Sequence, residues 1–207
     1  MRLPAQNPIA KTLTALPKRY TYLMLRPPIK HCRECGIAVV YRLPDDGDTR
    51  HRAICTLCST VHYENPLNVV GTVPVWGDSG DQVLLCKRNI EPRWGKWTLP
   101  AGFMELGETT AQGAARETDE EAGAEYEMQD LFTVMNVVRV GQVHFYYRAR
   151  LLSPDFNPGH ETIEARLFTE AEIPWEEIAF RTVKETLEHY FEDRRKGRFE
   201  THVIDVA

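Results

Sequence analysis

The sequence lacks the features of a membrane-spanning or secreted protein. It contains no run of 18 apolar residues, the length at which a helix becomes a candidate to cross a bilayer. It also lacks the short apolar segment of a secretory signal peptide. We therefore expect the protein to act in the cytoplasm. With 207 residues and 43% hydrophobic content, the chain can form one ordinary domain and a small additional module.

Acidic residues are absent from the first 30 positions, which hold six of the 25 basic residues. Organelle transit peptides have this charge pattern, but they are rich in serine and this segment has none, so we interpret residues 1–30 as a basic N-terminal arm. The rest of the chain carries 19 basic and 30 acidic residues. This acidic body argues against a general affinity for nucleic acid.

Cysteine is scarce, and four of the five cysteines form two CxxC pairs. Cys32 and Cys35 are separated from Cys55 and Cys58 by 19 residues, a spacing typical of a four-cysteine Zn²⁺ site. The residues between the pairs favour a hairpin with its turn at 45–48, so residues 31–65 are predicted to form a zinc ribbon. Two disulfides are the alternative, which the lack of a signal peptide disfavours. Cys86 lies in an apolar run and is expected in the core.

The pattern of residue types along the chain changes after residue 65. Runs rich in β-forming residues alternate with two helical patterns, which predicts an α/β domain over residues 66–195 and a C-terminal tail over 196–207. Strands are expected at 68–76, 82–87, 97–101, 131–140, 142–151 and 164–168, and helices at 110–123 and 181–194.

Three glutamates crowd one face of the first predicted helix. Glu117, Glu120 and Glu121 stand at i, i+3 and i+4, within about 100° of the helix circumference. Like charges this close repel one another, and a bound Mg²⁺ or Mn²⁺ would remove the conflict because hard cations prefer oxygen ligands. A solvated acidic face is the alternative.

The rest of this helix favours the metal site. Thr109 and Gln112 form a capping-box pattern at its start, and Gly123 stands where a helix ends in the left-handed conformation. Small residues, among them Ala114 and Thr118, make a narrow face that can pack closely on a sheet. The predicted helix is therefore short and tightly docked, with the glutamates on its other side.

The stretch from Gly102 to Ala124 resembles the Nudix box. In this motif a glycine is followed by five residues, a glutamate, seven further residues and the pattern REUxEExGU, where U is a bulky apolar residue. Two U positions hold less apolar residues, Thr118 and Ala124, and we expect the Thr118 hydroxyl to bond back to the preceding turn. The resemblance implies a Nudix α/β/α sandwich with a mixed sheet, preceded here by a small β zinc ribbon. All seven fixed positions match: Gly102, Glu108, Arg116, Glu117, Glu120, Glu121 and Gly123.

The resemblance also implies roles for these residues in metal-dependent hydrolysis of a diphosphate. Glu117, Glu120 and Glu121 would hold Mg²⁺ or Mn²⁺ ions, and Arg116 would orient the carboxylates. Such enzymes often take a general base from a loop after the box, for which Glu161 and Glu164 are the candidates. Further residues are expected to contact substrate or assist from the loop: Arg88, Gly102, Glu105 and Glu108.

A zinc ribbon before a Nudix domain is similar to two groups of enzymes. NADH pyrophosphatases carry an SQPWPFPxS-like array after the box, which this chain lacks. Segments such as HCRECG and EARLFTEAEIPWEEIAF resemble Nudix enzymes similar to plant FAD and ADP-ribose pyrophosphatases. We therefore expect a dinucleotide such as FAD or ADP-ribose to be cleaved with release of AMP, and NADH pyrophosphatase is the alternative.

Two further questions stay open in the sequence. A ribbon that binds nucleic acid, joined to a Nudix domain that senses a nucleotide without turnover, is the rival from another class. The ribbon's balanced charge and the intact glutamates argue against it. The aromatic residues Phe145, Tyr146 and Tyr147 could stack a base, although alternating strand residues more often belong to a core. Nudix enzymes that act on dinucleotides commonly dimerise, so a homodimer is possible.

Overall fold

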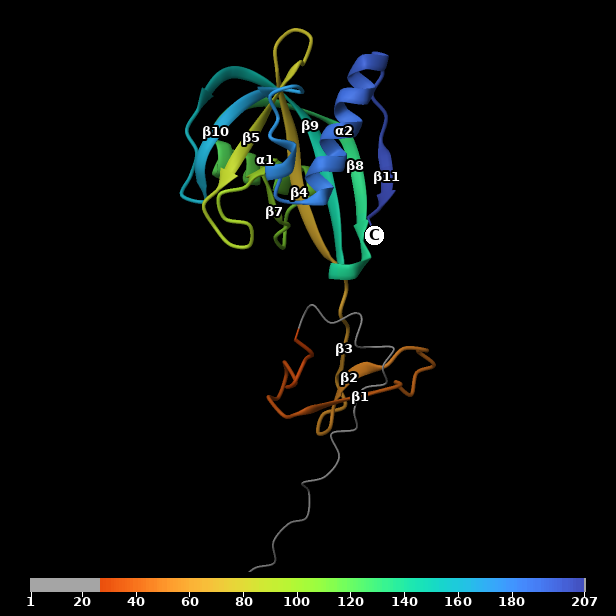
Figure 1. Ribbon diagram of the computed structural model, residues 1–207. Helices are drawn as coiled ribbons and strands as arrows, with labels where there is room; N and C mark the ends of the chain where they lie inside the picture. Colours follow the sequence, from red (N-terminus) through yellow and green to blue (C-terminus); the bar gives the residue numbers. More distant parts are fainter. Residues whose placement is uncertain (1–26, 207) are drawn as a thin grey trace, which may run out of the picture. The chain divides into compact units, whose positions relative to one another are not determined.

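The computed structural model describes residues 27–206, and the chain divides into two compact units between Tyr63 and Glu64 (Figure 1). Most of the predicted basic arm lies outside the described residues. Within residues 27–206, no helix is long and apolar enough to cross a membrane. Each unit is described by itself below.

The first unit contains a three-stranded antiparallel sheet. β1 (Val39–Arg42) and β2 (Arg52–Cys55) form the predicted hairpin, and β3 (Val61–His62) pairs with β2. An ion pair between Arg52 and Asp48, with Nε and Oδ2 2.8 Å apart, braces the predicted turn. A hairpin this short buries little apolar surface, which is why such a unit needs a metal or disulfide to fold.

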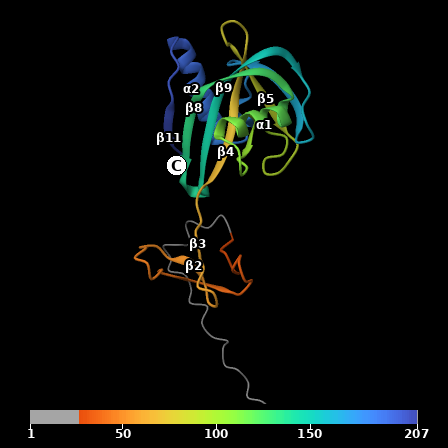
Figure 2. The same ribbon diagram turned by 180° about the vertical axis from the view of Figure 1, so that it is seen from behind.

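The second unit is a mixed sheet with one helix on each face, as Figures 1 and 2 show from opposite sides. The strands follow the order β10-β5-β4-β9-β8-β11, with β6 beside β5 and β7 beside β4. β4 and β9 are parallel, as are β8 and β11, while the other pairs are antiparallel. The elements are β4 (Leu67–Trp76), β5 (Gln82–Arg88), β6 (Trp97–Thr98), β7 (Ala101–Phe103), α1 (Thr110–Ala122), β8 (Ala124–Val137), the 3₁₀ turn η1 (Val138–Val140), β9 (Gln142–Phe156), β10 (Thr162–Thr169), the 3₁₀ turn η2 (Trp175–Glu177), α2 (Arg181–Lys196) and β11 (His202–Asp205).

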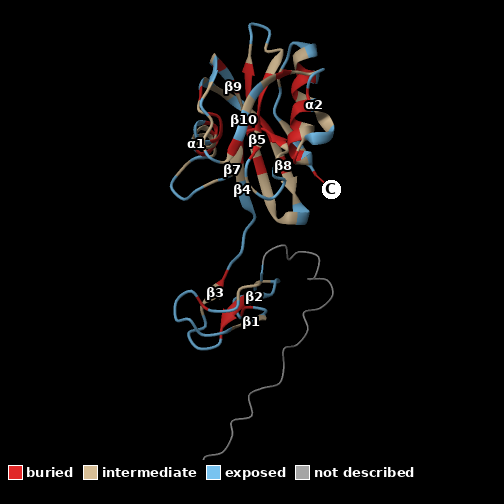
Figure 3. Cartoon of the chain, turned by 60° about the vertical axis from the view of Figure 1, so that its left-hand side comes forward, coloured by how far each residue is buried: buried red, intermediate tan, exposed pale blue. Residues whose placement is uncertain are grey.

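Alternation along β5 gives the sheet two apolar faces, because successive side chains of a strand point to opposite sides. Val83 and Leu85 belong to the core under α2, whereas Leu84 and Cys86 belong to the core that includes Ala122 of α1. Both cores are visible as buried segments of the sheet and helices in Figure 3. The predicted α/β/α sandwich is confirmed, as is the burial of Cys86.

The structure differs from the sequence prediction mainly at strand ends. β8 starts directly after α1, β9 continues to Phe156, and residues 138–140 form a 3₁₀ turn rather than strand. The segment 196–207 was expected to be a tail, but it contains β11, which runs parallel to β8 with His202 opposite Thr133. A four-residue strand gives too few residues for a periodic signal, so sequence reasoning missed it.

Candidate functional site

Helix α1 begins and ends as the sequence predicts. The Thr109 hydroxyl accepts a hydrogen bond from the Gln112 backbone N–H at 3.2 Å, and the Gln112 side chain accepts one from the Thr109 N–H at 2.9 Å. The helix ends at Gly123, whose φ is +55°. A Cβ at Gly123 would also collide with the carbonyl oxygen of Asn157, so only glycine fits this position.

The inner face of α1 is anchored to the sheet through Thr118. Its hydroxyl donates to the Ala114 carbonyl at 2.7 Å, as predicted. The same oxygen lies 2.7 Å from the hydroxyl of Thr72 on β4, and both side chains are fully buried. Because the Thr118 proton goes to Ala114, the Thr72 hydroxyl donates to Thr118, which explains why a threonine occupies an apolar position of the box.

Arg116 lies at the centre of the carboxylate cluster and bridges three glutamates. Its guanidinium donates to Glu108 from Nε at 3.1 Å and from Nη2 at 3.0 Å. Nη1 donates to Glu117 at 2.8 Å and to Glu120 at 3.1 Å. Nη2 also donates to the carbonyl of Phe103 at 3.1 Å, which ties the cluster to the end of β7. Arg116 therefore holds three carboxylates by hydrogen bonds, and its role in orienting them for catalysis stays a prediction.

The loop before α1 is fitted closely to these carboxylates. A Cβ at Gly102 would lie 2.5 Å from the Glu117 carboxylate, so the glycine makes room for Glu117. The Glu105 backbone N–H donates to Glu108 Oε1 at 2.7 Å, while the Glu105 side chain is exposed. The absence of a side chain at Gly102 thus leaves space for Glu117, and the Glu105 backbone holds Glu108. Contact of Gly102 and Glu105 with substrate stays a prediction.

Glu121 departs from the expected arrangement. The sequence placed it on the outer side of α1, but its side chain is only 6% exposed and accepts a hydrogen bond from the Ala101 N–H at 2.9 Å. Burial raises the pKa of Glu121 to about 8 and also raises the pKa of Glu117. Buried carboxylates with raised pKa values are groups that a bound cation would stabilise in the charged form. The donor set thus fits a hard divalent cation.

A loop from β9 to β10 brings Glu161 to this cluster. The Asn157 N–H donates to the Ala122 carbonyl at 3.1 Å, and the Gly159 N–H donates to the Glu120 carbonyl at 3.1 Å. These bonds cap the last turn of α1 and hold the loop beside it. The charge of Glu161 contributes to raising the pKa of both Glu117 and Glu121, which places it within electrostatic reach of them.

Glu164, the other candidate base, lies on the opposite face of the sheet. It stands opposite Lys87 in the register of β10 and β5, and the Lys87 ammonium lies 5.7 Å from the centre of the Trp97 ring, in the core under α2. Strand alternation therefore directs Glu164 away from α1. Strand alternation thus separates Glu164 from α1, whereas the loop that carries Glu161 is hydrogen-bonded to the end of that helix.

Arg88 is buried close to Glu121. Its side chain is 7% exposed, and Nε donates to the Pro92 carbonyl at 3.0 Å. The guanidinium lies 5.1 Å from the centre of the Phe180 ring. Its positive charge lowers the pKa of Glu121, although burial outweighs it. Arg88 thus supplies fixed positive charge beside the carboxylates.

The three aromatic residues of β9 that could stack a base, Phe145, Tyr146 and Tyr147, are buried or half-buried. Tyr146 is 2% exposed in the core under α2, so the idea that it stacks a base is wrong. The Tyr147 hydroxyl lies 2.7 Å from that of Thr110 at the start of α1, and Phe145 is half-buried. Strand alternation explains the outcome, because it sends neighbouring residues into opposite layers.

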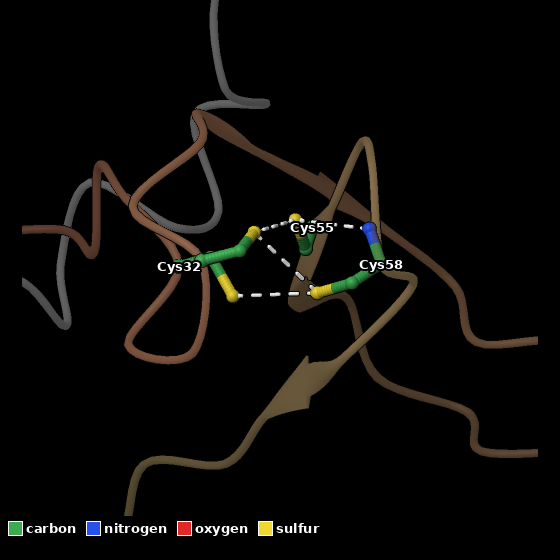
Figure 4. A group of neighbouring side chains, drawn as sticks. Cys32, Cys55 and Cys58 are labelled. Carbon is green, nitrogen blue, oxygen red and sulfur yellow. Dashed lines mark hydrogen bonds between the residues drawn. The ribbon is translucent and has the colours of Figure 1, made fainter.

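The ligand atoms of the four ribbon cysteines all lie within 4.8 Å of one another. Figure 4 labels three of these residues, Cys32, Cys55 and Cys58, whose side chains point toward one another. The Sγ–Sγ distances are 3.6 Å for Cys32–Cys58, 3.4 Å for Cys35–Cys55 and 3.6 Å for Cys35–Cys58. Zn–S bonds of about 2.3 Å in a tetrahedron place the sulfurs roughly 3.8 Å apart, whereas a disulfide needs about 2.05 Å. All four are free thiols, so the disulfide alternative is wrong. The cluster fits a structural Zn²⁺ ion.

Hydrogen bonds lower the pKa of two of the four thiols, Cys55 and Cys58, whereas the pKa of Cys35 is raised to about 12. The Leu57 and Cys58 N–H groups both donate to Cys55 Sγ at 3.4 Å. Hydrogen bonds with Thr60 lower the pKa of the Cys58 thiol to about 6, and the backbone bond from Cys58 lowers the pKa of Cys55. Thiolates are the form that binds a metal.

The mixed sheet with a helix on each face, the carboxylates around Arg116 and the four-cysteine ribbon are the arrangement that the Nudix resemblance implies. Residues 66–193 match the NUDIX domain and residues 30–64 match the Nudix N-terminal zinc ribbon. The chain belongs to the Nudix family. It has both the hydrolase domain and the ribbon that the sequence resemblance implied.

Known relatives agree with this assignment. A NUDIX hydrolase from Nitrosomonas europaea is 49% identical with a TM-score of 0.81, over 86% of this chain and 99% of that one. An ADP-ribose pyrophosphatase from Streptococcus suis is 25% identical with a TM-score of 0.53, over 68% of this chain and 100% of that one. The NAD-capped RNA hydrolase NudC from Photobacterium profundum is 30% identical over 69% of this chain and 51% of that protein, so the chain spans about half its length.

Proposed function

We propose that the protein hydrolyses the diphosphate bond of a nucleoside diphosphate linked to another group, with FAD or ADP-ribose as substrate and AMP as one product. The observation that carries this proposal is the set of carboxylates gathered on α1 around Arg116. Glu161 joins them from a loop that is hydrogen-bonded to the end of the same helix. A diphosphate and its cations need such a set of oxygen ligands.

Glu117, Glu120 and Glu121 are the residues that would hold Mg²⁺ or Mn²⁺. Each bond from Arg116 uses one oxygen of Glu117 or Glu120, and a carboxylate has a second oxygen with which to bind a cation. Bound divalent cations would neutralise the diphosphate and lower the pKa of the attacking water. The raised pKa of buried Glu121 supports this assignment, because a cation would offset the cost of its charge.

The chain's own residues prepare the reaction around that ligand set. Arg116 fixes the orientation of Glu117 and Glu120, so few side-chain rotamers must be frozen when substrate binds. Glu161 would accept the proton of the attacking water through its carboxylate. Arg88 holds positive charge beside Glu121, where negative charge from the diphosphate would accumulate.

Two lines of similarity support the substrate class. The ADP-ribose pyrophosphatase from Streptococcus suis covers 68% of this chain at 25% identity. The sequence segments that resemble FAD and ADP-ribose pyrophosphatases run from the ribbon to about residue 180. A second candidate is a nicotinamide dinucleotide, free or at the end of an RNA, because the chain is 30% identical to a NAD-capped RNA hydrolase.

The ribbon's proposed role is structural. Four cysteines complete a tetrahedral Zn²⁺ site and leave no open position for substrate. The cytoplasmic location and the homodimer stay predictions.

The proposed function is tested by product analysis. Purified protein is incubated with FAD, ADP-ribose, NADH and a NAD-capped RNA, each with Mg²⁺ and with Mn²⁺, and the products are separated by chromatography. We expect FAD or ADP-ribose to release AMP fastest. Faster cleavage of NADH or of the capped RNA would favour the second candidate, and release of no AMP from any substrate would refute the proposal.

Two variants connect that activity to the cluster. Glu120→Gln should lower kcat on the order of a thousandfold, since it removes a cation ligand while preserving the side chain's shape. Glu125→Gln is the matched control, because Glu125 is an exposed glutamate at the start of β8. Equal losses in both variants would show that the box glutamates have no special part.

A further inference from the structure

The loop between β5 and β6 carries an exposed tryptophan, Trp94, that belongs to neither apolar core. Trp94 is 61% exposed, whereas Trp97, three residues later, is 5% exposed. Trp76 and Trp175 are both half-buried. An indole ring that remains in water forgoes much of the free energy gained by burying its large apolar surface. An exposed, ordered indole is therefore a candidate for contact with a ligand.

The Trp94 ring is held at its edge rather than across its faces. Its Nε1–H donates to the Asn89 side-chain oxygen at 3.3 Å. The backbone on both sides of it is also tied down, because the Gly95 N–H donates to the Arg88 carbonyl at 2.8 Å and the Arg88 N–H donates to the Lys96 carbonyl at 2.9 Å. A hydrogen bond at the ring edge fixes the indole and leaves its π faces for stacking.

Asn89 links Trp94 to the carboxylate cluster. The Asn89 backbone N–H donates to the Glu161 carbonyl at 2.8 Å, and its side-chain amide donates to the His160 carbonyl at 2.8 Å. Glu161 in turn lies within electrostatic reach of Glu117 and Glu121. Trp94 is thus joined by two hydrogen-bonded steps to the residue proposed to take the proton.

We propose that Trp94 is a base-binding residue that stacks on a planar ring of the substrate while its diphosphate lies at the carboxylates. The inference rests on the proposed function and adds the position of the base. A purine or flavin ring attached to the diphosphate is the occupant that this geometry fits, since the uncharged indole is linked through Asn89 to the loop that carries Glu161. Base–aromatic stacking tolerates different rings, which agrees with either FAD or ADP-ribose.

A binding measurement tests this inference without turnover. Trp94 is the most exposed of the four tryptophans, so acrylamide should quench its fluorescence first. We expect AMP or FMN to protect the wild-type protein from quenching, ribose 5-phosphate to protect it much less, and the Trp94→Leu variant to show no base-dependent protection. Free tryptophan in the same solutions corrects for light absorbed by FMN. Equal quenching with and without both nucleotides would overturn the inference.

Steady-state kinetics give the second readout. Trp94→Leu should raise KM for the cleaved dinucleotide about tenfold with little change in kcat, because stacking holds the base rather than the reacting atoms. Trp94→Phe should recover most of that loss. Val138→Ala, which shortens a 67% exposed side chain in the turn between β8 and β9, is the control and should behave as wild type. An unchanged KM in Trp94→Leu would contradict the proposal.

These two measurements separate the inference from the proposed function. If the wild-type protein cleaves no substrate, the proposed function fails and the quenching experiment alone decides whether Trp94 binds a base. If cleavage occurs and neither quenching nor KM depends on Trp94, the proposed function stands and the inference fails.

Discussion

The ribbon and helix α1 each gather like-charged ligand groups, and they do so in different ways. In the ribbon, four sulfur atoms lie within 4.8 Å of one another. On α1, the carboxylates of Glu108, Glu117 and Glu120 face the guanidinium of Arg116. Among the described residues, the cysteine group is the one whose ligand atoms already lie that close together. The first arrangement suits a permanent ion and the second an exchangeable one.

The two clusters also differ in what stabilises the charged form of their ligands. Hydrogen bonds with Thr60 lower the pKa of Cys58 to about 6, whereas burial raises the pKa of Glu121 to about 8. In the ribbon, hydrogen bonds thus favour the thiolate form of Cys55 and Cys58. The buried glutamate depends on a cation from outside the chain. The predictions that follow test this contrast.

The largest effect is expected in the ribbon. Cys55→Ser should abolish Zn²⁺ retention and unfold residues 31–63, because structural zinc supplies roughly 10 kcal/mol or more to such units. Elemental analysis and hydrogen exchange measure the two outcomes. Leu57→Ala, an exposed position in the same turn, is the control. Zinc bound at wild-type level in Cys55→Ser would contradict a four-cysteine site.

The next effect concerns pH and Glu121. Its pKa is raised from 4.5 to about 8 in the folded protein, so its effect on stability is most favourable below about pH 4.5. The free energy of unfolding of protein without Mg²⁺ or Mn²⁺ should then fall as the pH rises toward 8, by roughly 3 to 5 kcal/mol. Urea unfolding at several pH values measures this. Glu121→Gln should lose most of this dependence, and Mg²⁺ should stabilise the wild type more than the variant. A wild-type curve parallel to that of the variant would refute the burial argument.

Glu161 and Glu164 form a matched pair for the catalytic step. Glu161→Gln should lower kcat on the order of a hundredfold, because general bases contribute about 10² or more. Glu164→Gln should change kcat less than about twofold, since its side chain lies on the face away from α1. A larger loss for Glu164→Gln would reverse the assignment.

The smallest effect involves the paired hydroxyls of Thr72 and Thr118. Thr118→Val leaves the Thr72 hydroxyl buried without its partner and should cost about 1 to 3 kcal/mol. The double variant with Thr72→Val should recover most of this loss, because both polar groups are gone. Chemical denaturation of the four proteins completes the double-mutant cycle. Additive losses would show that the two hydroxyls do not depend on each other.

The sequence predicts well whatever depends on local spacing. The capping box, the left-handed Gly123, the back-bond of Thr118 and the cysteine cluster all follow from residues close together in the chain. It predicts less well what depends on packing between distant segments. Thr72, the partner of Thr118, is 46 positions away in the sequence. The face on which Glu164 lies depends on its pairing with Lys87 on β5, a strand far away in the sequence. Glu121 shares the helical spacing of its neighbours, so its burial could not be read from the pattern.

The central claim is that the chain has a closed thiolate site and a separate, exchangeable carboxylate site. Titrating zinc-loaded protein with Mn²⁺, followed by electron paramagnetic resonance, tests it most directly. The account predicts that wild-type protein binds Mn²⁺, that Glu120→Gln binds it at least about tenfold more weakly, and that both keep their zinc. Equal Mn²⁺ affinity in the two proteins, or loss of zinc as Mn²⁺ binds, would contradict it.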